Sequence, residues 1–237
     1  MIKTTAMLHN ELRQYANPAV KIKRMADSRI ITPIIKGIYE TDASTPGHYL
    51  AGIIYGPSYL SFEYALAWHD LIPEAVYNYT SATCGKGRKK QYDTAFGTYL
   101  YRDVPVAVFP YGTELHVENG YSFVIASPEK ALCDQLYTIS PCANRVELKQ
   151  LLYEDLRIDP QALTGLRMDD MIELAGLYNT RNHRLLASLA KEIKRNESLL
   201  VYQMGHPEVS GFSGICQSPL SLEYLNALSG QIHPEGG

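Results

Sequence analysis

The chain has 237 residues, 46% of which are hydrophobic, and a formal net charge of −3 at pH 7. This composition is that of a globular protein with one large or two modest domains. No stretch approaches the roughly 20 apolar residues of a membrane span, and the first residues lack the apolar run of a signal peptide, so we expect a cytoplasmic protein without a membrane contact.

The charge is distributed unevenly along the chain. Residues 1–40 carry seven Lys or Arg and three Asp or Glu, which gives +4, whereas residues 196–237 carry no Lys or Arg and four Glu, which gives −4. Only the first forty residues therefore have the sign that suits a polyanion. If the protein binds nucleic acid, we expect the contact there.

The first elements read as two helices and a hairpin. Met7, Leu8, Leu12 and Tyr15 have helical spacing over residues 4–15. A second helix is predicted from Asn17, a favourable N-cap before a proline, to residue 26 or 27. Residues 29–39 are rich in β-branched side chains around Lys-Gly and predict two short strands joined by a turn.

Together these elements predict a small winged helix-turn-helix over residues 1–40. Helical geometry places Ile22, Met25 and Ala26 on the inner face of the second helix. The outward face and its flank, together with the hairpin, supply the candidate DNA contacts, which are Val20, Lys21, Lys23, Arg24, Arg29 and Lys36. A helical lid with solvated lysines is the competing interpretation of the same pattern.

Residues 41–47 form a polar Pro/Gly connector and the predicted domain boundary. Residues 48–55 are an apolar run compatible with a helix or a strand. In residues 57–74 we expect a core helix of about three turns, with Ser58 or Ser61 as N-cap, a buried stripe of Phe62, Ala65 and Leu66, and an end near residues 69–71 ahead of Pro73.

Strands are predicted next, at 77–80, 98–101, 104–109, 114–117 and 121–125, followed by a helix that starts at Ser127-Pro128. Further helices are expected at 146–156, from 160, at 168–178 and at 180–195. The fold class is therefore α+β, with a larger mixed domain over 48–195 that combines an antiparallel sheet and carboxy-terminal helices. Residues 196–237 read as a flexible acidic tail, with a short helix at 219–228.

A basic segment lies between two of the predicted strands. Lys86, Arg88, Lys89 and Lys90 occur within six residues that also contain two glycines. The segment forms either a secondary basic patch against a nucleic-acid backbone or a charged hairpin that discourages strand pairing at a sheet edge.

The sequence gives no positive sign of catalysis. Phosphate-cradle, dinucleotide, zinc-protease and serine-hydrolase motifs do not occur, and Cys84, Cys133, Cys142 and Cys216 lack zinc-ligand spacing. We therefore assign no catalytic residue, metal or cofactor. His69 with Asp70 reads as an acid/base pair or as a helix end, and Glu63 and Glu129 are the polar residues most suited to meeting at a site.

Four segments in fixed order, together with the hairpin sequence KGIYE, resemble the AbiEi-type antitoxin family of abortive-infection, type IV toxin–antitoxin systems. The segments are PSYLSFEYALAWHDLIPE from residue 57, TSAT from 80, RKKQYDTAFGTYLYRDVP from 88 and IASPEKALCDQLY from 125. The resemblance covers about residues 8–195.

The resemblance implies an antitoxin that is not an enzyme. Its winged helix-turn-helix would bind operator DNA upstream of its own operon, and its larger domain would counter a neighbouring nucleotidyltransferase-like toxin without a stable complex. Two departures, a single helix before the recognition helix and Asp27 on the outward face, predict weaker binding or a requirement for a homodimer. The tail after Arg195 has no counterpart in the family.

Two alternatives stay open. The first is an ordinary winged-helix regulator whose larger domain senses a ligand or oligomerises. The second is a degenerate nuclease-like enzyme, since Glu147-Leu148-Lys149 and Glu192-Ile193-Lys194 match the letters of an E-x-K motif; both fall on predicted helices, where charged side chains are usually solvated.

Overall fold

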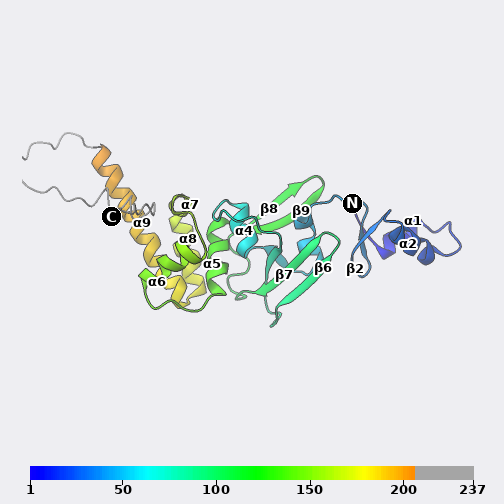
Figure 1. The fold of residues 1–237 in the computed structure, drawn as a ribbon, viewed down its shortest axis with the longest axis horizontal. Helices are drawn as coiled ribbons and strands as arrows, with labels where there is room; N and C mark the ends of the chain where they lie inside the picture. Colours follow the sequence, from blue (N-terminus) through cyan, green and yellow to red (C-terminus); the bar gives the residue numbers. More distant parts are fainter. Residues whose placement is uncertain (206–237) are drawn as a thin grey trace, which may run out of the picture. The chain divides into compact units, whose positions relative to one another are not determined.

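The computed structural model describes residues 1–205, in which helices and two β-sheets form a mixed α+β protein (Figure 1). Residues 1–191 make up one compact unit, and the part of the last helix beyond Lys191 belongs to a second. No helix among the described residues has the length and apolar character needed to cross a membrane.

The first forty residues form a three-stranded antiparallel sheet beside two helices. In chain order the elements are β1 (Ile2–Thr4), α1 (Thr5–Glu11), α2 (Pro18–Asp27), β2 (Thr32–Ile35) and β3 (Ile38–Glu40). The sheet order is β1-β3-β2, so the predicted hairpin is present, and a strand that the sequence analysis missed pairs with its second arm. Leu8, Ile22 and Ile31 are buried together at the centre of this part.

Residues 47–126 form a six-stranded sheet with short helices. They comprise η1 (Gly47–Leu50), α3 (Ala51–Ile54), β4 (Ser58–Leu60), α4 (Phe62–Trp68), β5 (Tyr79–Thr83), β6 (Lys90–Thr94), β7 (Gly97–Asp103), β8 (Thr113–Glu118) and β9 (Tyr121–Ala126). The strand order is β6-β7-β5-β4-β9-β8. The β4–β5, β6–β7 and β8–β9 pairs are antiparallel, but only β8–β9 joins two strands that the sequence predicts. The β5–β7 and β4–β9 pairs are parallel, so this sheet is mixed, which corrects the expectation of an antiparallel sheet in the larger domain.

Helices follow the sheet as expected. They are α5 (Pro128–Tyr137), α6 (Arg145–Gln150), the π-helical η2 (Leu151–Asp155), α7 (Pro160–Thr164), α8 (Met168–Tyr178) and α9 (Arg181–Gly205). Ser127 caps α5 by accepting a hydrogen bond from the Lys130 N–H at 3.2 Å, with Pro128 in the first turn. The central α5 contacts both α4 and α8, and almost every side chain along it is buried.

Three predicted elements differ from the structure. Residues 58–60 form a strand, so α4 has seven residues rather than three turns, although Phe62, Ala65 and Leu66 are buried as predicted. Residues 104–109 form turns instead of a strand. The last helix continues to Gly205, past its predicted end at residue 195, and the short helix predicted at 219–228 lies outside the described residues.

Candidate nucleic-acid interface

The second helix is fixed in place at its start and along one face. The Asn17 side chain accepts a hydrogen bond from the Val20 N–H at 3.1 Å, and Pro18 occupies the first turn, as the sequence predicts. Ile22 is buried against Leu8 and Ile31, and Met25 packs on the same cluster. The face opposite to Ile22 is therefore the one that α2 presents to solvent.

That outward face is basic. Lys23 and Arg24 are exposed, Val20 between them and the helix start is 44% exposed, and Asp27 is exposed at the helix end. Within residues 1–205, Lys23 and Arg24 have no carboxylate at ion-pair distance. Lys21 is half-buried, with its Nζ 5.1 Å from the centre of the Tyr15 ring. Two cationic groups on α2 are thus available to an external anion.

The β2–β3 hairpin presents two more cations near this helix. Lys36 is exposed at the turn, where Gly37 has φ +86°, and the Gly37 carbonyl accepts a hydrogen bond from the Thr5 N–H at 2.9 Å. Arg29 is exposed in a left-handed conformation just after α2. A backbone hydrogen bond therefore joins the first helix to the hairpin, and the buried Leu8, Ile22 and Ile31 pack the second helix against both. All six predicted residues except the half-buried Lys21 are exposed.

The basic segment between β5 and β6 is an ordered loop. The Asp103 carboxylate accepts hydrogen bonds from the N–H groups of Lys86 at 2.7 Å and Gly87 at 2.6 Å and from the Thr83 hydroxyl at 2.6 Å. Burial acts to raise the pKa of Asp103, but these hydrogen bonds outweigh it and the pKa is lowered. The carboxylate therefore stays charged and holds the loop in one conformation.

The four basic residues of this loop divide into two groups. Lys86 is used internally, because its Nζ donates to the Gly56 carbonyl at 3.2 Å and lies 5.2 Å from the centre of the Tyr55 ring. Arg88 and Lys89 are exposed and Lys90 is half-buried, and the described part of the chain offers none of them an ion-pair partner. Only this second group is available to a ligand.

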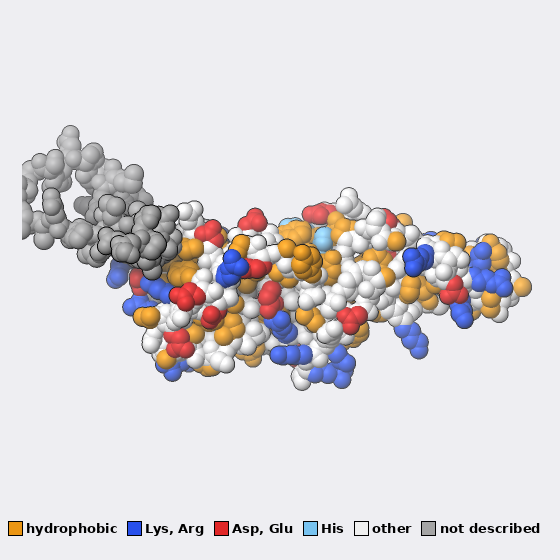
Figure 2. Space-filling view, in the orientation of Figure 1, with side chains coloured by type: hydrophobic (Ala, Val, Ile, Leu, Met, Phe, Trp, Pro, Cys, Tyr) orange, Lys and Arg blue, Asp and Glu red, His pale blue; other side chains and the backbone are white. Residues whose placement is uncertain are grey.

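The structure does not merge the loop with the α2 surface. Strand β6 contacts β2. The end of β6 near the linker is its carboxy-terminal end, because Phe96, in the turn after β6, lies against Gly47 of the linker. Lys90 begins β6 at its other end, about 14 Å away for a five-residue strand. Figure 2 shows Lys and Arg side chains over the region of α1 and α2 and a separate group below β6 and β7.

A buried polar network that the sequence analysis missed joins α5 to α8 and β4. Lys130 and Asp134, one turn apart on α5, are fully buried with 3.3 Å between Nζ and Oδ1. Lys130 also donates to the Val108 carbonyl at 3.0 Å and to the Tyr178 hydroxyl. The other Asp134 oxygen accepts from the hydroxyls of Ser61 at 2.6 Å and Tyr59 at 3.0 Å.

The charged groups of Lys130 and Asp134 have hydrogen-bond or ion-pair partners on all sides. Burial raises the pKa of Asp134 and lowers that of Lys130, and each group opposes the shift of the other. Tyr178 donates to Asp134, and burial raises its pKa as well. Because every polar atom of Lys130 and Asp134 is engaged and neither is exposed, the arrangement is suited to linking α5 with α8 and the strands, not to binding a ligand.

Glu129, Glu63 and His69 each have an internal partner, although the Glu63 Oε2 atom is buried without one. Glu129 accepts from the Arg167 N–H at 3.0 Å and pairs with its guanidinium at 3.2 Å, whereas Glu63 pairs with Arg102 at 2.9 Å, so the two glutamates do not meet. The His69 ring contacts the Ala126 carbonyl at 2.8 Å, which agrees with a structural helix end.

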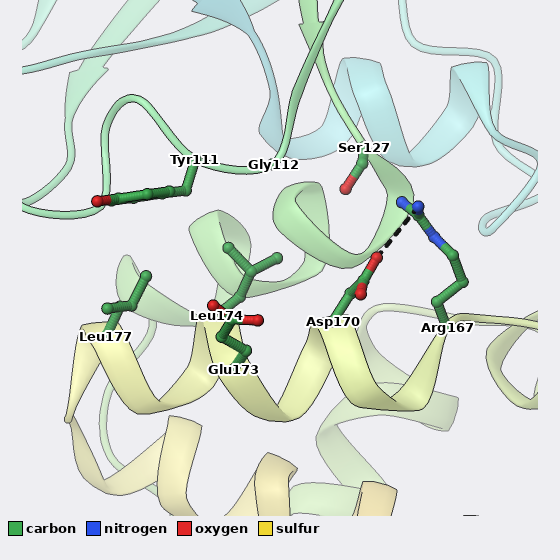
Figure 3. A pocket seen from close by; sticks show the side chains of 8 residues that line it. All are labelled: Tyr111, Gly112, Ser127, Arg167, Asp170, Glu173, Leu174 and Leu177. Carbon is green, nitrogen blue, oxygen red and sulfur yellow. Dashed lines mark ion pairs between the residues drawn. The ribbon is translucent and has the colours of Figure 1, made fainter.

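Two of the cavities within residues 1–191 bear on a ligand site. The smaller, about 170 Å³, lies over α8, and Figure 3 shows Arg167 paired with Asp170 at 3.1 Å beside Ser127, with Leu174 and Leu177 further along. The larger, about 660 Å³, lies at the linker between β3 and η1 and is lined by Asp42, Ser44, Thr45, Tyr49, Asn119 and Tyr121 together with the first residues. The smaller cavity is below the usual volume of a small-molecule site, and the larger is within it.

The two sequences that match the letters of an E-x-K motif lie on helices. Glu147 and Lys149 lie on α6, and Glu192 and Lys194 on α9, as predicted. In the portion of the chain that the structure describes, no three His, Cys, Asp or Glu side chains are grouped so that they could hold a metal ion. Cys84, Cys133 and Cys142 are free thiols, and Cys216 lies outside the described residues.

Neither a scan against models of protein families nor a search of curated proteins finds a match for this chain.

Proposed function

We propose that this protein is a DNA-binding antitoxin that represses its own operon and counters a neighbouring nucleotidyltransferase-like toxin. The observation that carries the DNA-binding part is the α2 surface, on which Lys23 and Arg24 are exposed, with no ion-pair partner among the described residues, while the opposite face is buried. In this proposal the first forty residues act as a winged helix-turn-helix, with α2 in the major groove and the β2–β3 hairpin as the wing.

Charge supports this assignment of roles. Lysine and arginine side chains that face solvent without a carboxylate partner are suited to phosphate oxygens, and binding releases counterions from the DNA. Val20 lies on the same surface and can contact a thymine methyl group. Lys36 at the hairpin turn and Arg29 just after α2 add phosphate contacts, so a polyanion would meet cations from two elements that are packed together.

The test is the salt dependence of binding to the DNA upstream of the operon. The double variant Lys23→Ala/Arg24→Ala should lower affinity on operator and unrelated DNA and reduce the slope of log K against log salt by about 2. A control with the same change in charge, Lys191→Ala/Arg195→Ala, removes two exposed cations from α9. If both double variants behave like the wild type, α2 does not bind DNA.

The toxin-directed part is supported by the resemblance of the larger domain to the AbiEi-type antitoxins. It is tested by growth of cells that express the neighbouring gene with the wild-type chain, with Lys23→Ala/Arg24→Ala, or alone. We expect arrest with the neighbour alone and rescue by both forms of this chain, because the α2 surface is separate from the larger domain. A harmless neighbour, or a failure of the wild type to rescue, would contradict the antitoxin proposal.

The cavity at the linker favours one alternative, a regulator that binds DNA in response to a ligand. At about 660 Å³ it has room for a small molecule, and Asp42, Ser44, Thr45 and Asn119 offer polar groups. A ligand held there would contact both the first residues and the β8–β9 turn. Retention of operator binding with no effect on the neighbouring gene's toxicity would move the proposal to this alternative. A degenerate nuclease has no such support.

A further inference from the structure

The six-stranded sheet has two edges, and they differ in chemistry. At one edge, β6 carries Lys90, Gln91 and Asp93 and contacts β2, which are the features that keep an edge strand from pairing with another chain. At the other edge, β8 pairs with β9 on one side only, and no further strand of the described chain adjoins it (Figure 1). Among the described residues, the β8 edge therefore lacks the contact with the three-stranded sheet that β6 has.

The exposed side chains of β8 are apolar on one face and charged on the other. On one face lie Glu114, His116 and Glu118; the His116 ring stacks on Phe123 and meets the ring of Trp68 on α4, and its Nε2 is 3.5 Å from the Glu114 carboxylate. Leu115 is 68% exposed and Val117 is 70% exposed, and strand alternation puts both on the sheet face opposite to α4. Two large apolar side chains on an unpaired edge are unusual for a strand that stays solvated.

We propose that β8 is a homodimer interface, in which two copies of this chain pair antiparallel through β8 about a two-fold axis at Leu115. A two-fold axis perpendicular to the sheet keeps each face on the same side, so only residues of like parity can be opposite each other. With the axis at Leu115, Leu115 meets its own copy and Thr113 meets Val117. On the other face, each Glu114 meets the His116 of the second copy, which places a carboxylate opposite an imidazole N–H donor in two cross-strand pairs.

The neighbouring register is disfavoured by its charges. With the axis at His116 instead, Glu114 would be opposite Glu118 in both halves of the interface, and like charges directly opposite are destabilising. The order Glu-Leu-His thus makes this strand self-complementary in one register. Because six-residue strands bury a small area, the dimer should be weak, with a Kd of about 1–100 μM, and it does not depend on the protein's binding DNA.

Cross-linking tests the register directly. In a Cys84→Ser/Cys216→Ser background, Leu115→Cys should form a disulfide-linked dimer on mild oxidation, because directly opposite residues have Cβ atoms roughly 5 Å apart. Val117→Cys is the matched control: it is equally exposed and on the same face, but in this register the two copies of residue 117 are about 13 Å apart. With the axis at His116, disulfides would instead form between the Leu115→Cys and Val117→Cys variants when the two are mixed, and neither would cross-link alone.

Exchange of charge tests the same interface without cysteine. Sedimentation of the full chain should show that Glu114→Lys and His116→Glu each weaken the dimer by roughly tenfold, and that the double variant recovers most of the loss. Both positions are partly exposed, so circular dichroism should show an unchanged fold. A wild-type chain that stays monomeric to about 200 μM, a dimer strengthened by Glu114→Lys, or equal cross-linking of both cysteine variants would overturn the proposal.

Discussion

The replacement of Asp134 by alanine should destabilise the larger domain more than any surface change. Its carboxylate is fully buried and accepts hydrogen bonds from Tyr59, Ser61 and Tyr178 while pairing with Lys130. In Asp134→Ala the Lys130 amine stays buried with only the Val108 carbonyl and Tyr178 as partners. Removing one partner of a buried pair costs about 3–5 kcal/mol, a large share of the roughly 5–15 kcal/mol that holds a typical protein folded.

Urea unfolding gives the measurement, because the chain has a single tryptophan, Trp68, at the end of α4, where its ring contacts Phe123. Its fluorescence and the far-ultraviolet circular dichroism should report one transition, shifted to lower urea in Asp134→Ala. Asp155→Ala removes an exposed carboxylate and should change the unfolding free energy by less than about 0.5 kcal/mol. The apolar double variant Lys130→Met/Asp134→Leu should be more stable than Asp134→Ala. A loss below about 1 kcal/mol in Asp134→Ala would refute the reasoning.

Two further predictions concern stability. His183 is fully buried between the Cys133 carbonyl at 2.9 Å and the Thr180 hydroxyl at 2.7 Å, and burial lowers its pKa from 6.5 to about 4. Between these pH values the unfolded chain binds a proton at His183 that the folded chain does not, so the free energy of unfolding should fall by up to about 3 kcal/mol as the pH drops from about 6.5 to about 4. In urea titrations, His183→Gln should reduce this dependence of the unfolding free energy on pH. An equal dependence in both proteins would contradict the prediction. Gly112→Ala, at φ +66°, would bring a Cβ to 2.9 Å from the Lys130 Cβ, and thermal unfolding should show a loss of stability of roughly 2 kcal/mol or more. Gly85→Ala has the same φ but no atom within 4 Å, so it should lose only about 1 kcal/mol. Equal losses in the two variants would show that the contact with Lys130 plays no part.

The sequence was most informative where capping chemistry and hydrophobic spacing agree. Asn17-Pro18 and Ser127-Pro128 each begin a helix at the predicted residue, and Asn119-Gly120, with positive φ at both positions, makes the turn between the strands predicted at 114–117 and 121–125. These signals are local, since a cap or a turn depends on residues within four positions. The inner face of α2 followed for the same reason, because helical geometry fixes which side chains share a side.

Elements that depend on distant partners could not be read in the same way. β1 and β4 are three-residue strands, and neither has a strand-like pattern of its own; Ile2 pairs with Glu40 and Ser58 with Thr83, far along the chain in both cases. Of the two predicted caps, Ser58 lies in β4, whereas Ser61 is the N-cap residue of α4. Its hydroxyl does not cap the helix, however, because it donates to Asp134, a residue 73 positions later. Lys130 and Asp134 were similarly hidden, because charged residues one turn apart usually indicate a solvated helix face.

The basic surface and the buried network should respond to substitution in opposite ways. Lys23 and Arg24 have no ion-pair partner among the described residues and lie opposite the packed face of α2, so their loss removes nothing that stabilises the fold. Asp134 touches no solvent, so its loss acts on DNA binding only through the folded fraction. At low temperature, where both variants are folded, Lys23→Ala/Arg24→Ala should bind DNA weakly with a wild-type melting midpoint, and Asp134→Ala should bind normally with a lowered one. The reverse pattern would mean that the larger domain, and not α2, contacts the DNA.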